Sequence, residues 1–241
     1  MSRSELFLRP SRLPLVAPSI LSADFARLGE ECRAVLESGA DLLHLDVMDG
    51  HFVPNLTMGP ALCASLRTAL PNAALDVHLM VRNPAAYVGP FVDAGADLLT
   101  FHIEAVPDPR ELAATIRGRG ILAGLALNPD APVERVLPFL ASFDLILVMS
   151  VFPGFSGQRF IPEVLEKVRT ISPRLQPEQR LEMDGGVGPS TAPLCRDAGC
   201  DLLVAASAIF HAPDYGAAIS TLRGPTVAAR MSATPGAGTG G

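Results

Sequence analysis

The segment Gly39-Ala40-Asp41-Leu42-Leu43 recurs along the chain, and its spacing decides the fold class. Two near copies and one weaker copy follow it: Gly95-Ala96-Asp97-Leu98-Leu99, Gly199-Cys200-Asp201-Leu202-Leu203 and Phe143-Asp144-Leu145-Ile146-Leu147. The aspartates lie about 50 residues apart, a length that suits two strand–helix units. In each full copy the glycine is expected to end a helix in a left-handed conformation, so that a strand starts immediately after it. Four such pairs of units predict eight strands.

Eight short apolar runs fit this count, with amphipathic segments between them. Nearly continuous apolar character is typical of parallel strands that are covered on both faces. The runs are Leu15–Ile20, Leu42–Val47, Leu75–Met80, Leu98–Ile103, Leu122–Leu127, Leu145–Met149, Leu181–Met183 and Leu202–Ala206. The helical patterns include Asp24–Ser38, Pro84–Ala94, Ile161–Ile171 and Ser190–Ala198.

These patterns predict an α/β protein that folds as a single (β/α)8 TIM barrel. The main alternative is an open doubly wound sheet. No Gly-x-Gly-x-x-Gly motif opens the first strand–helix unit, and the fourfold repeat favours closure. We expect an N-terminal extension at residues 1–14, the barrel at 15–223 and a flexible tail at 224–241. That tail is rich in Ser, Ala, Thr and Gly and is expected to bury too little apolar surface to order itself.

Composition argues against several classes of partner. The formal net charge is −6, whereas nucleic-acid-binding proteins usually carry a basic surface. The chain also has no tryptophan, a residue on which nucleic-acid bases often stack. No apolar run reaches the length that a membrane span requires. The four cysteines have no Cys-x-x-Cys spacing, which is typical of reduced, buried thiols. We therefore expect a cytoplasmic protein that acts on a small molecule.

Histidines and carboxylates occur at the ends of three of the apolar runs. His44 and Asp46 are two residues apart on one run, so their side chains project from the same side of the strand. His78 and Asp184 end two further runs. In a barrel the carboxyl ends of all strands meet at one face, where these four side chains could converge on an ion. Imidazole and carboxylate ligands suit a divalent Zn, Fe(II), Mn or Co ion without selecting one of them.

Glycine-rich loops follow the last three strands and predict a phosphate site. The loop after the sixth run is Pro153-Gly154-Phe155-Ser156-Gly157-Gln158, Gly185-Gly186 follows the seventh, and Ala206-Ser207 the eighth. Glycines let backbone N–H groups approach an anion closely. Barrels of this class often hold phosphate at the loops after the last two strands.

The two predicted sites together suggest a proton-transfer reaction on a sugar phosphate. A metal that binds two adjacent substrate oxygens would stabilise an enediolate. Asp46 and Asp184 would then remove and return a proton on opposite faces, which inverts a carbon next to a ketone. Met48, Met80 and Met149 are candidates to line the site, although they are equally typical of plain core. Among the other polar residues, Asp49 and His51 are expected to organise a loop, His102 to lie on the rim, and His211 to lie on the surface.

Several motifs resemble those of the ribulose-phosphate 3-epimerases, over the chain from about Leu15 to Leu222. The motifs are Ala17–Phe25, His44–Asn55, Asp76–Val81, Pro153-Gly154-Phe155 with Gly157-Gln158, Glu182–Val187 and Ser207–Phe210.

This resemblance implies a barrel of the ribulose-phosphate-binding type and interconversion of D-ribulose 5-phosphate and D-xylulose 5-phosphate. It implies a homo-oligomer in the pentose phosphate pathway, carbon fixation or both. One divalent metal ion per subunit would be held by His44, Asp46, His78 and Asp184. Asp46 and Asp184 would exchange the roles of proton acceptor and donor between the two directions. The resemblance further implies substrate contacts from Ser19, His78, Gly154, Phe155, Ser156, Gly157, Asp184, Gly185, Gly186, Ala206 and Ser207.

Three positions depart from the family pattern, which commonly has Asn at Phe152 and Gly at Ser156 and Ala206. A Cβ at the last two positions could crowd the phosphate or forbid a positive φ. Three alternatives to the pentulose epimerase stay open. They are a 3-epimerase of a ketohexose 6-phosphate such as allulose 6-phosphate, a non-catalytic sugar-phosphate binding barrel, and a decarboxylase on a similar barrel. The decarboxylase is expected to need a lysine near the reacting carbon, and the chain has only Lys167.

Overall fold

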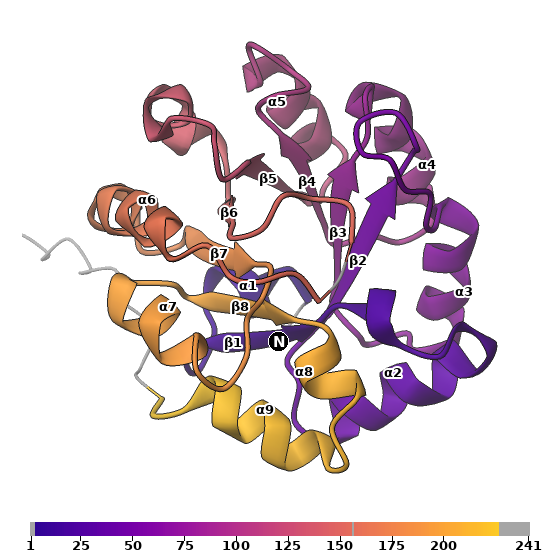
Figure 1. Cartoon of the computed structure of the whole chain (residues 1–241). Coiled ribbons are helices and arrows are strands. Elements are labelled where there is room, and N and C mark those ends of the chain that lie inside the picture. Colours follow the sequence, from indigo (N-terminus) through magenta and orange to yellow (C-terminus); the bar gives the residue numbers. More distant parts are fainter. Residues whose placement is uncertain (1–2, 156, 227–241) are drawn as a thin grey trace, which may run out of the picture.

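A computed structural model describes residues 3–155 and 157–226 of the chain, and it has the predicted (β/α)8 architecture (Figure 1). The strands are β1 (Leu15–Pro18), β2 (Leu43–Met48), β3 (Leu75–Met80), β4 (Leu98–His102), β5 (Leu122–Leu127), β6 (Leu145–Met149), β7 (Arg180–Asp184) and β8 (Leu202–Ala205). They pair in parallel in the order β1-β8-β7-β6-β5-β4-β3-β2. Three of them match the predicted runs residue for residue, and the others differ by one or two residues at an end.

The barrel closes between β1 and β2. Ser19, just beyond β1, bridges in parallel to His44 of β2, and its N–H also donates to the Ala205 carbonyl of β8. At the other end of the same seam, the Asp41 N–H donates to the Val16 carbonyl. These contacts join the two ends of the sheet, so the alternative of an open doubly wound sheet is wrong.

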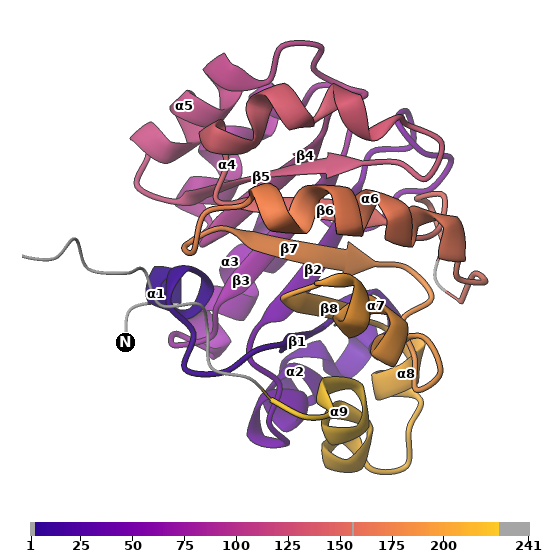
Figure 2. The same cartoon turned by 90° about the vertical axis from the view of Figure 1, so that its left-hand side faces the viewer.

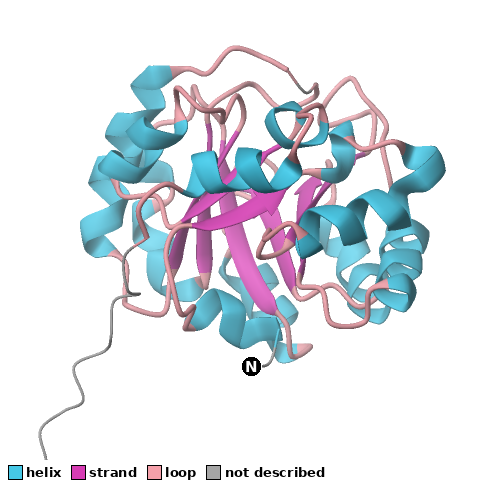
Figure 3. Ribbon diagram, turned by 90° about the horizontal axis from the view of Figure 1, so that it is seen from below, coloured by secondary structure: helices cyan, strands magenta, loops and turns pink. Residues whose placement is uncertain are grey.

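Helices form a ring around the strands in the view of Figure 1, and Figure 3 shows them flanking the strands from the side. The α-helices of the ring are α2 (Leu28–Glu37), α3 (Pro60–Ala69), α4 (Val88–Asp93), α5 (Arg110–Gly118), α6 (Leu165–Ile171), α7 (Ala192–Ala198), α8 (Ser207–Phe210) and α9 (Tyr215–Arg223). Several predicted helical segments begin as a short 3-10 turn, as Pro84–Tyr87 does before α4. The connection between β5 and β6 consists of the 3-10 turns Val133–Arg135 and Leu137–Ser142. No helix within the described ranges has the length and apolar character to span a membrane.

The repeated aspartate fixes the register between neighbouring strands. In every copy one carboxylate oxygen accepts the N–H of a residue on the preceding odd-numbered strand, and the aspartate's own N–H donates to that residue's carbonyl. The carboxylate bonds are Asp41 to Val16 (2.8 Å), Asp97 to Leu75 (2.9 Å), Asp144 to Ala123 (2.9 Å) and Asp201 to Leu181 (3.1 Å). The glycines of the full copies have positive φ, as predicted; for Gly95 the value is 90°. The repeat therefore joins strands in pairs around the barrel.

The N-terminal extension contains a helix, α1 (Arg3–Leu8), that covers the amino-terminal end of the barrel (Figure 2). Phe7 is 2% exposed and packs among strand leucines at this end, including Leu15 and Leu42. The buried guanidinium of Arg180 donates to the carbonyls of Phe7 and Leu8. One end of the barrel is thereby sealed, and the open end is the carboxyl end of the strands. Of the predicted flexible tail, residues 227–241 lie outside the described residues.

Replacing Asp97 with alanine tests the role of the repeat. Asp97 accepts hydrogen bonds from the Leu75 N–H, from Arg67 (2.6 Å) and from Arg3 (2.8 Å). The variant leaves the buried N–H of Leu75 without this partner, so we expect a loss of about 1–3 kcal/mol of unfolding free energy in chemical denaturation. The control is Asp93→Ala, because Asp93 is exposed in its pair with Arg119, and such pairs contribute little. Equal stability of the two variants would contradict the account.

Candidate functional site

The four side chains predicted to bind metal meet at the open end of the barrel. His44 and Asp46 come from β2, His78 from β3 and Asp184 from β7, and one ligand atom from each lies within 4.8 Å of the others. All four occupy inward positions on their strands, where alternate residues face the barrel axis; Asp184 ends β7, whereas His44 is the second residue of β2. Both imidazoles are fully buried, and the Asp46 and Asp184 side chains are 7% and 14% exposed.

Only one nitrogen–oxygen pair among these four side chains is within ordinary hydrogen-bond distance: His78 Nδ1 lies 3.2 Å from Asp46 Oδ1. His78 Nδ1 also lies 3.7 Å from Asp184 Oδ2. His44 Nε2 lies 3.4 Å from Asp46 Oδ1 and, although buried, has no hydrogen-bond partner. Buried polar atoms are normally paired. An unpaired imidazole nitrogen aimed at carboxylates is therefore the arrangement that a cation would complete.

The two carboxylates differ in acidity. Burial and the neighbouring charge of Asp46 raise the pKa of Asp184 to about 7. Burial also acts to raise the pKa of Asp46, but the charges and hydrogen bonds of His44 and His78 outweigh it and hold this pKa well below its usual range. Asp46 is thus a carboxylate ready to accept a proton, and Asp184 is an acid that can give one near neutral pH.

The two imidazoles also differ. Burial is the main reason that the pKa of His78 is lowered, to about 4, which keeps this ring neutral and able to offer a lone pair. For His44, burial acts to lower the pKa, but the charges of Asp76 and Asp46 outweigh it and raise the pKa well above its usual range.

Sequence reasoning assigned no role to Asp76 and Glu182, whose carboxylates lie next to Nδ1 of His44. His44 Nδ1 lies 2.7 Å from Asp76 Oδ2 and 3.4 Å from Glu182 Oε1, and all three side chains are fully buried. Burial and the charge of Asp76 raise the pKa of Glu182 well above its usual range. The signal that could have identified them was strand alternation, because each stands two residues before a predicted ligand and on the same face.

His102 lies inside the barrel, so its predicted position on the rim is wrong. Its side chain is fully buried, and its Nε2 lies 2.8 Å from Nε2 of His78. The inward direction follows from alternation along β4, whose carboxyl end places residue 102 level with the cluster.

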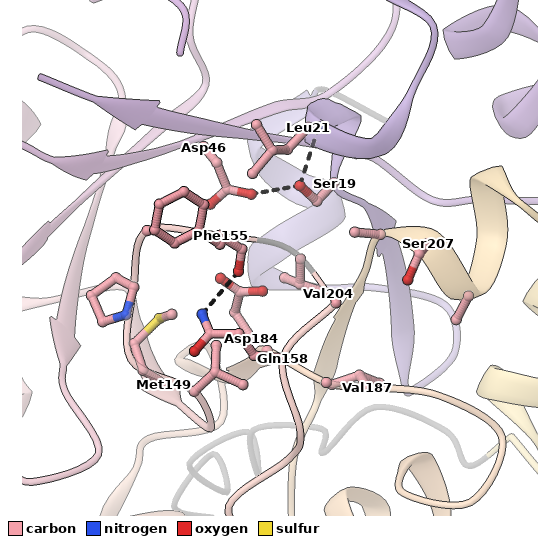
Figure 4. Close-up of a pocket in the computed structure, with 18 of the residues that line it drawn as sticks. Ser19, Leu21, Asp46, Met149, Phe155, Gln158, Asp184, Val187, Val204 and Ser207 are labelled. Atoms are coloured by element: carbon pink, nitrogen blue, oxygen red, sulfur yellow. Dashed lines mark hydrogen bonds between the residues drawn. The ribbon is translucent and has the colours of Figure 1, made fainter. Parts of the chain in front are cut away.

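A cavity of about 460 Å³ opens above the cluster. Figure 4 shows the carboxylates of Asp46 and Asp184 directed into it, with Ser19 beside Asp46. The Ser19 hydroxyl donates to Asp46 Oδ2 at 2.5 Å. All three candidate methionines, Met48, Met80 and Met149, line the cavity. The interpretation of these methionines as lining is therefore confirmed.

The glycine-rich loops border the same cavity on the side of β6, β7 and β8. Gly186 has a φ of 60°, and a Cβ there would meet the Phe160 backbone N at 2.8 Å, so the chain requires glycine at this position. Ala206 has a φ of −103°, which removes the concern that its Cβ would forbid a positive φ. Most of the predicted substrate-contact residues line the cavity: Ser19, Gly154, Phe155, Gly157, Asp184, Gly185, Gly186, Ala206 and Ser207. His78 lies in the cluster below and does not line it, and Ser156 lies outside the described residues.

The remaining polar residues fall into two groups. Asp49 organises its loop as predicted, since its carboxylate accepts the N–H groups of His51, Phe52 and Arg82. His211 is exposed, as predicted, but it also borders the cavity. Lys167 donates to the carbonyls of Asn128, Pro129 and Ala131 and does not line the cavity, which disfavours the decarboxylase alternative.

Solved structures with the same fold include several enzymes of phosphorylated substrates. One is a 3-keto-L-gulonate-6-phosphate decarboxylase from Vibrio cholerae, with a TM-score of 0.65 and 14% identity, covering 88% of this chain and 96% of that chain. Another is a thiamine phosphate pyrophosphorylase from Pyrococcus furiosus, with a TM-score of 0.62 and 21% identity, covering 88% and 94% of the two chains. At these identities the likeness concerns the fold alone.

Curated relatives are much more similar in sequence. A ribulose-phosphate 3-epimerase of Mycobacterium tuberculosis is 48% identical over 90% of this chain and 95% of its own length. The corresponding enzyme of Bacillus subtilis is 48% identical over 87% and 98%. A protein of Oryza sativa named as the cytoplasmic isoform of this epimerase is 48% identical over 86% and 92%. A model of the ribulose-phosphate 3 epimerase family matches residues 15–210. The chain therefore belongs to the ribulose-phosphate 3-epimerase family.

Proposed function

We propose that this protein is a metal-dependent 3-epimerase that interconverts D-ribulose 5-phosphate and D-xylulose 5-phosphate. The observation that carries the proposal is the pairing of Asp46 and Asp184, two carboxylates of different acidity, in one cavity. Family membership supports the reaction, and the names of the relatives support the substrate. A cytoplasmic location is part of the proposal and is supported by the name of the rice relative. Assembly as a homo-oligomer is a further part, which rests on the resemblance alone.

A divalent cation fits the residues at the base of the cavity. His44 and His78 would offer nitrogen, and Asp46 and Asp184 oxygen, which is a ligand set for Zn, Fe(II), Mn or Co. The unpaired Nε2 of His44 and the neutral ring of His78 are the features that favour a cation. When bound, the ion supplies positive charge that stabilises an enediolate of the sugar.

Proton transfer belongs to the two aspartates. We propose that Asp46 removes the proton from C3 of one epimer and that Asp184 delivers a proton to the opposite face. The two side chains come from β2 and β7, which are separated around the barrel by β1 and β8. The roles reverse for the other epimer. The Ser19 hydroxyl, which donates to Asp46, holds this carboxylate in place and lies close enough to contact the sugar.

The loops after β6, β7 and β8 are proposed to hold the phosphate. Gly157, Gly185, Gly186 and Ser207 line the same cavity as the two carboxylates. The described lining includes no lysine or arginine. Backbone N–H groups and hydroxyls would therefore supply most of the contacts to the anion.

Two other functions are compatible with the fold. A 3-epimerase of a ketohexose 6-phosphate would use the same metal and acid–base residues, but its family pattern departs from this chain at Ser19–Phe25 and after Gly185. A non-catalytic sugar-phosphate binding protein would need no acid–base pair, so the presence of both aspartates in the cavity disfavours it.

Epimerisation of ribulose 5-phosphate by the purified protein is the direct test. We expect conversion to xylulose 5-phosphate that stops after chelation and returns when a divalent metal is added back, because the cation supplies charge stabilisation that the residues lack. Allulose 6-phosphate is the matched comparison substrate and should react much more slowly. No turnover of ribulose 5-phosphate with any added metal would overturn the proposal.

Asp46→Asn separates an epimerase from a binding protein. In an epimerase the variant should lose most turnover, by at least about 100-fold, since a general base contributes rate of that order. If the protein only binds the sugar phosphate, the wild type shows no turnover, and Asp46→Asn keeps the affinity of the wild type for the sugar phosphate. Asp49→Asn is the control, because Asp49 organises a loop and does not line the cavity.

Metal affinity should rise with pH. Below a pKa of about 7, Asp184 carries a proton that occupies a ligand oxygen, and the raised pKa of His44 has the same effect on a ligand nitrogen. Protons therefore compete with the cation, so we expect affinity to increase from about pH 6 to about pH 8. Calorimetric titration of the metal-free protein in buffers of different ionisation enthalpy would measure both the affinity and the protons released. Affinity that stays constant over this range contradicts the proposed ligands.

A further inference from the structure

A chain of hydrogen-bonding groups runs outward from the metal-binding cluster through residues that the reaction does not use. His78 Nε2 lies 2.8 Å from Nε2 of His102, and His102 Nδ1 lies 3.2 Å from Oε2 of Glu104. The second carboxylate oxygen of Glu104 accepts the N–H of Asn128 at 3.0 Å. The chain thus connects β3 with β4 and with the segment after β5.

Only one placement of the ring protons fits both this series of hydrogen bonds and a cation. His78 Nδ1 faces Asp46 and Asp184, so it must keep its lone pair free to bind a metal. Its proton then resides on Nε2 and is donated to His102 Nε2. Because Nε2 of His102 accepts this hydrogen bond, the proton of His102 lies on Nδ1, which donates to Glu104. Each donor in this series of hydrogen bonds then meets an acceptor. The series ends on the Glu104 carboxylate, which also accepts the backbone N–H of Asn128.

The surroundings of His102 leave its ring little freedom. The side chain is fully buried, its ring stacks on that of His78 with centroids 5.0 Å apart, and Phe52 covers it at 4.9 Å. Loss of the acceptor on His102 would leave the Nε2–H of His78 buried without a partner, which is costly. A hydrogen bond to the second nitrogen of a metal-binding histidine fixes its tautomer and its orientation.

We propose that His102 and Glu104 are positioning residues that hold His78 in the tautomer and orientation required for metal binding. The proposal rests on the metal site proposed above. It assigns a function to two residues that touch neither the sugar phosphate nor the ion. His102 acts by accepting from His78, and Glu104 acts by fixing which nitrogen of His102 carries the proton.

A matched pair of variants separates hydrogen bonding from packing. Methionine and glutamine have similar length, but glutamine offers His78 a strong amide-oxygen acceptor, whereas the thioether sulfur of methionine accepts hydrogen bonds only weakly. We expect His102→Met to weaken metal binding by about 10- to 100-fold, the usual cost of losing such an outer partner. His102→Gln should recover most of that affinity. The control is Thr100→Val, a nearly isosteric change two residues away on β4, where the buried hydroxyl has no hydrogen-bond partner; it should bind metal as the wild type does.

The measurement is binding of Zn²⁺ to the metal-free full-length protein, by competition with a chromophoric chelator. The second readout is the visible spectrum of the Co²⁺-loaded protein, which reports ligand geometry without requiring activity. Thermal unfolding of each metal-free variant shows whether a change in affinity reflects lost folding. Glu104→Gln is a further variant that keeps the side-chain shape but can no longer accept from both His102 and Asn128, and we expect it to weaken binding in the same direction as His102→Met.

Equal Zn²⁺ affinity and an unchanged Co²⁺ spectrum in His102→Met would overturn the positioning role, as would equal loss in the methionine and glutamine variants. If His102→Met does not fold, Glu104→Gln decides in the same way. Failure of the wild-type protein to bind Zn²⁺ or Co²⁺ is a different result, because it removes the proposed metal site itself. If the wild type and the variants bind metal equally well, the proposed metal site stands and only the positioning role is overturned.

Discussion

The constraint on which the site depends is the burial of four carboxyl groups, Asp46, Asp76, Glu182 and Asp184, around two imidazoles at the centre of the barrel. Buried charges are costly unless they are paired, hydrogen-bonded or bound to a cation. The four carboxyl groups are stabilised in different ways. Asp76 pairs with His44, raised pKa values favour protons on Glu182 and Asp184, and a lowered pKa keeps Asp46 ionised. In the proposed mechanism, that inequality suits one aspartate to accept a proton and the other to donate one.

The fold separates the parts that maintain the barrel from those that do chemistry. At the amino-terminal end, Phe7 and Arg180 close the barrel with apolar contacts and carbonyl hydrogen bonds, and the repeated aspartates fix the strand register. At the carboxyl end the inward positions turn polar, and glycine-rich loops leave a cavity above them. Such a division is general in barrels of this class. The strands whose register is fixed at the amino-terminal end also carry the side chains of the polar cluster, which sets the positions of those side chains relative to one another.

Much of this arrangement could be predicted from the sequence because it depends on local patterns. The repeat around Asp41 predicted the pairing of strands, and the ends of the apolar runs predicted where His44, Asp46, His78 and Asp184 would lie. Alternation along the strands also carries the signal for Asp76 and Glu182, but other contacts join segments that are distant in the sequence. Nothing local shows that the Asp97 carboxylate reaches the Leu75 N–H, that Phe7 returns to fill the barrel end, or that Glu104 meets His102 and Asn128 at once. His102 was placed on the rim because it stands near the end of its run, whereas alternation along β4 directs its side chain inward, next to His78.

Exchange of the C3 proton with D₂O, measured separately for each epimer with saturating metal, tests the use of two carboxylates most directly. The wild type should place deuterium at C3 of both ribulose 5-phosphate and xylulose 5-phosphate. Asp184→Asn should exchange the C3 proton of one epimer only, and Asp46→Asn that of the other only, because each variant keeps the base for a single face. Exchange of both epimers by either variant would show that one group serves both faces, which contradicts the account.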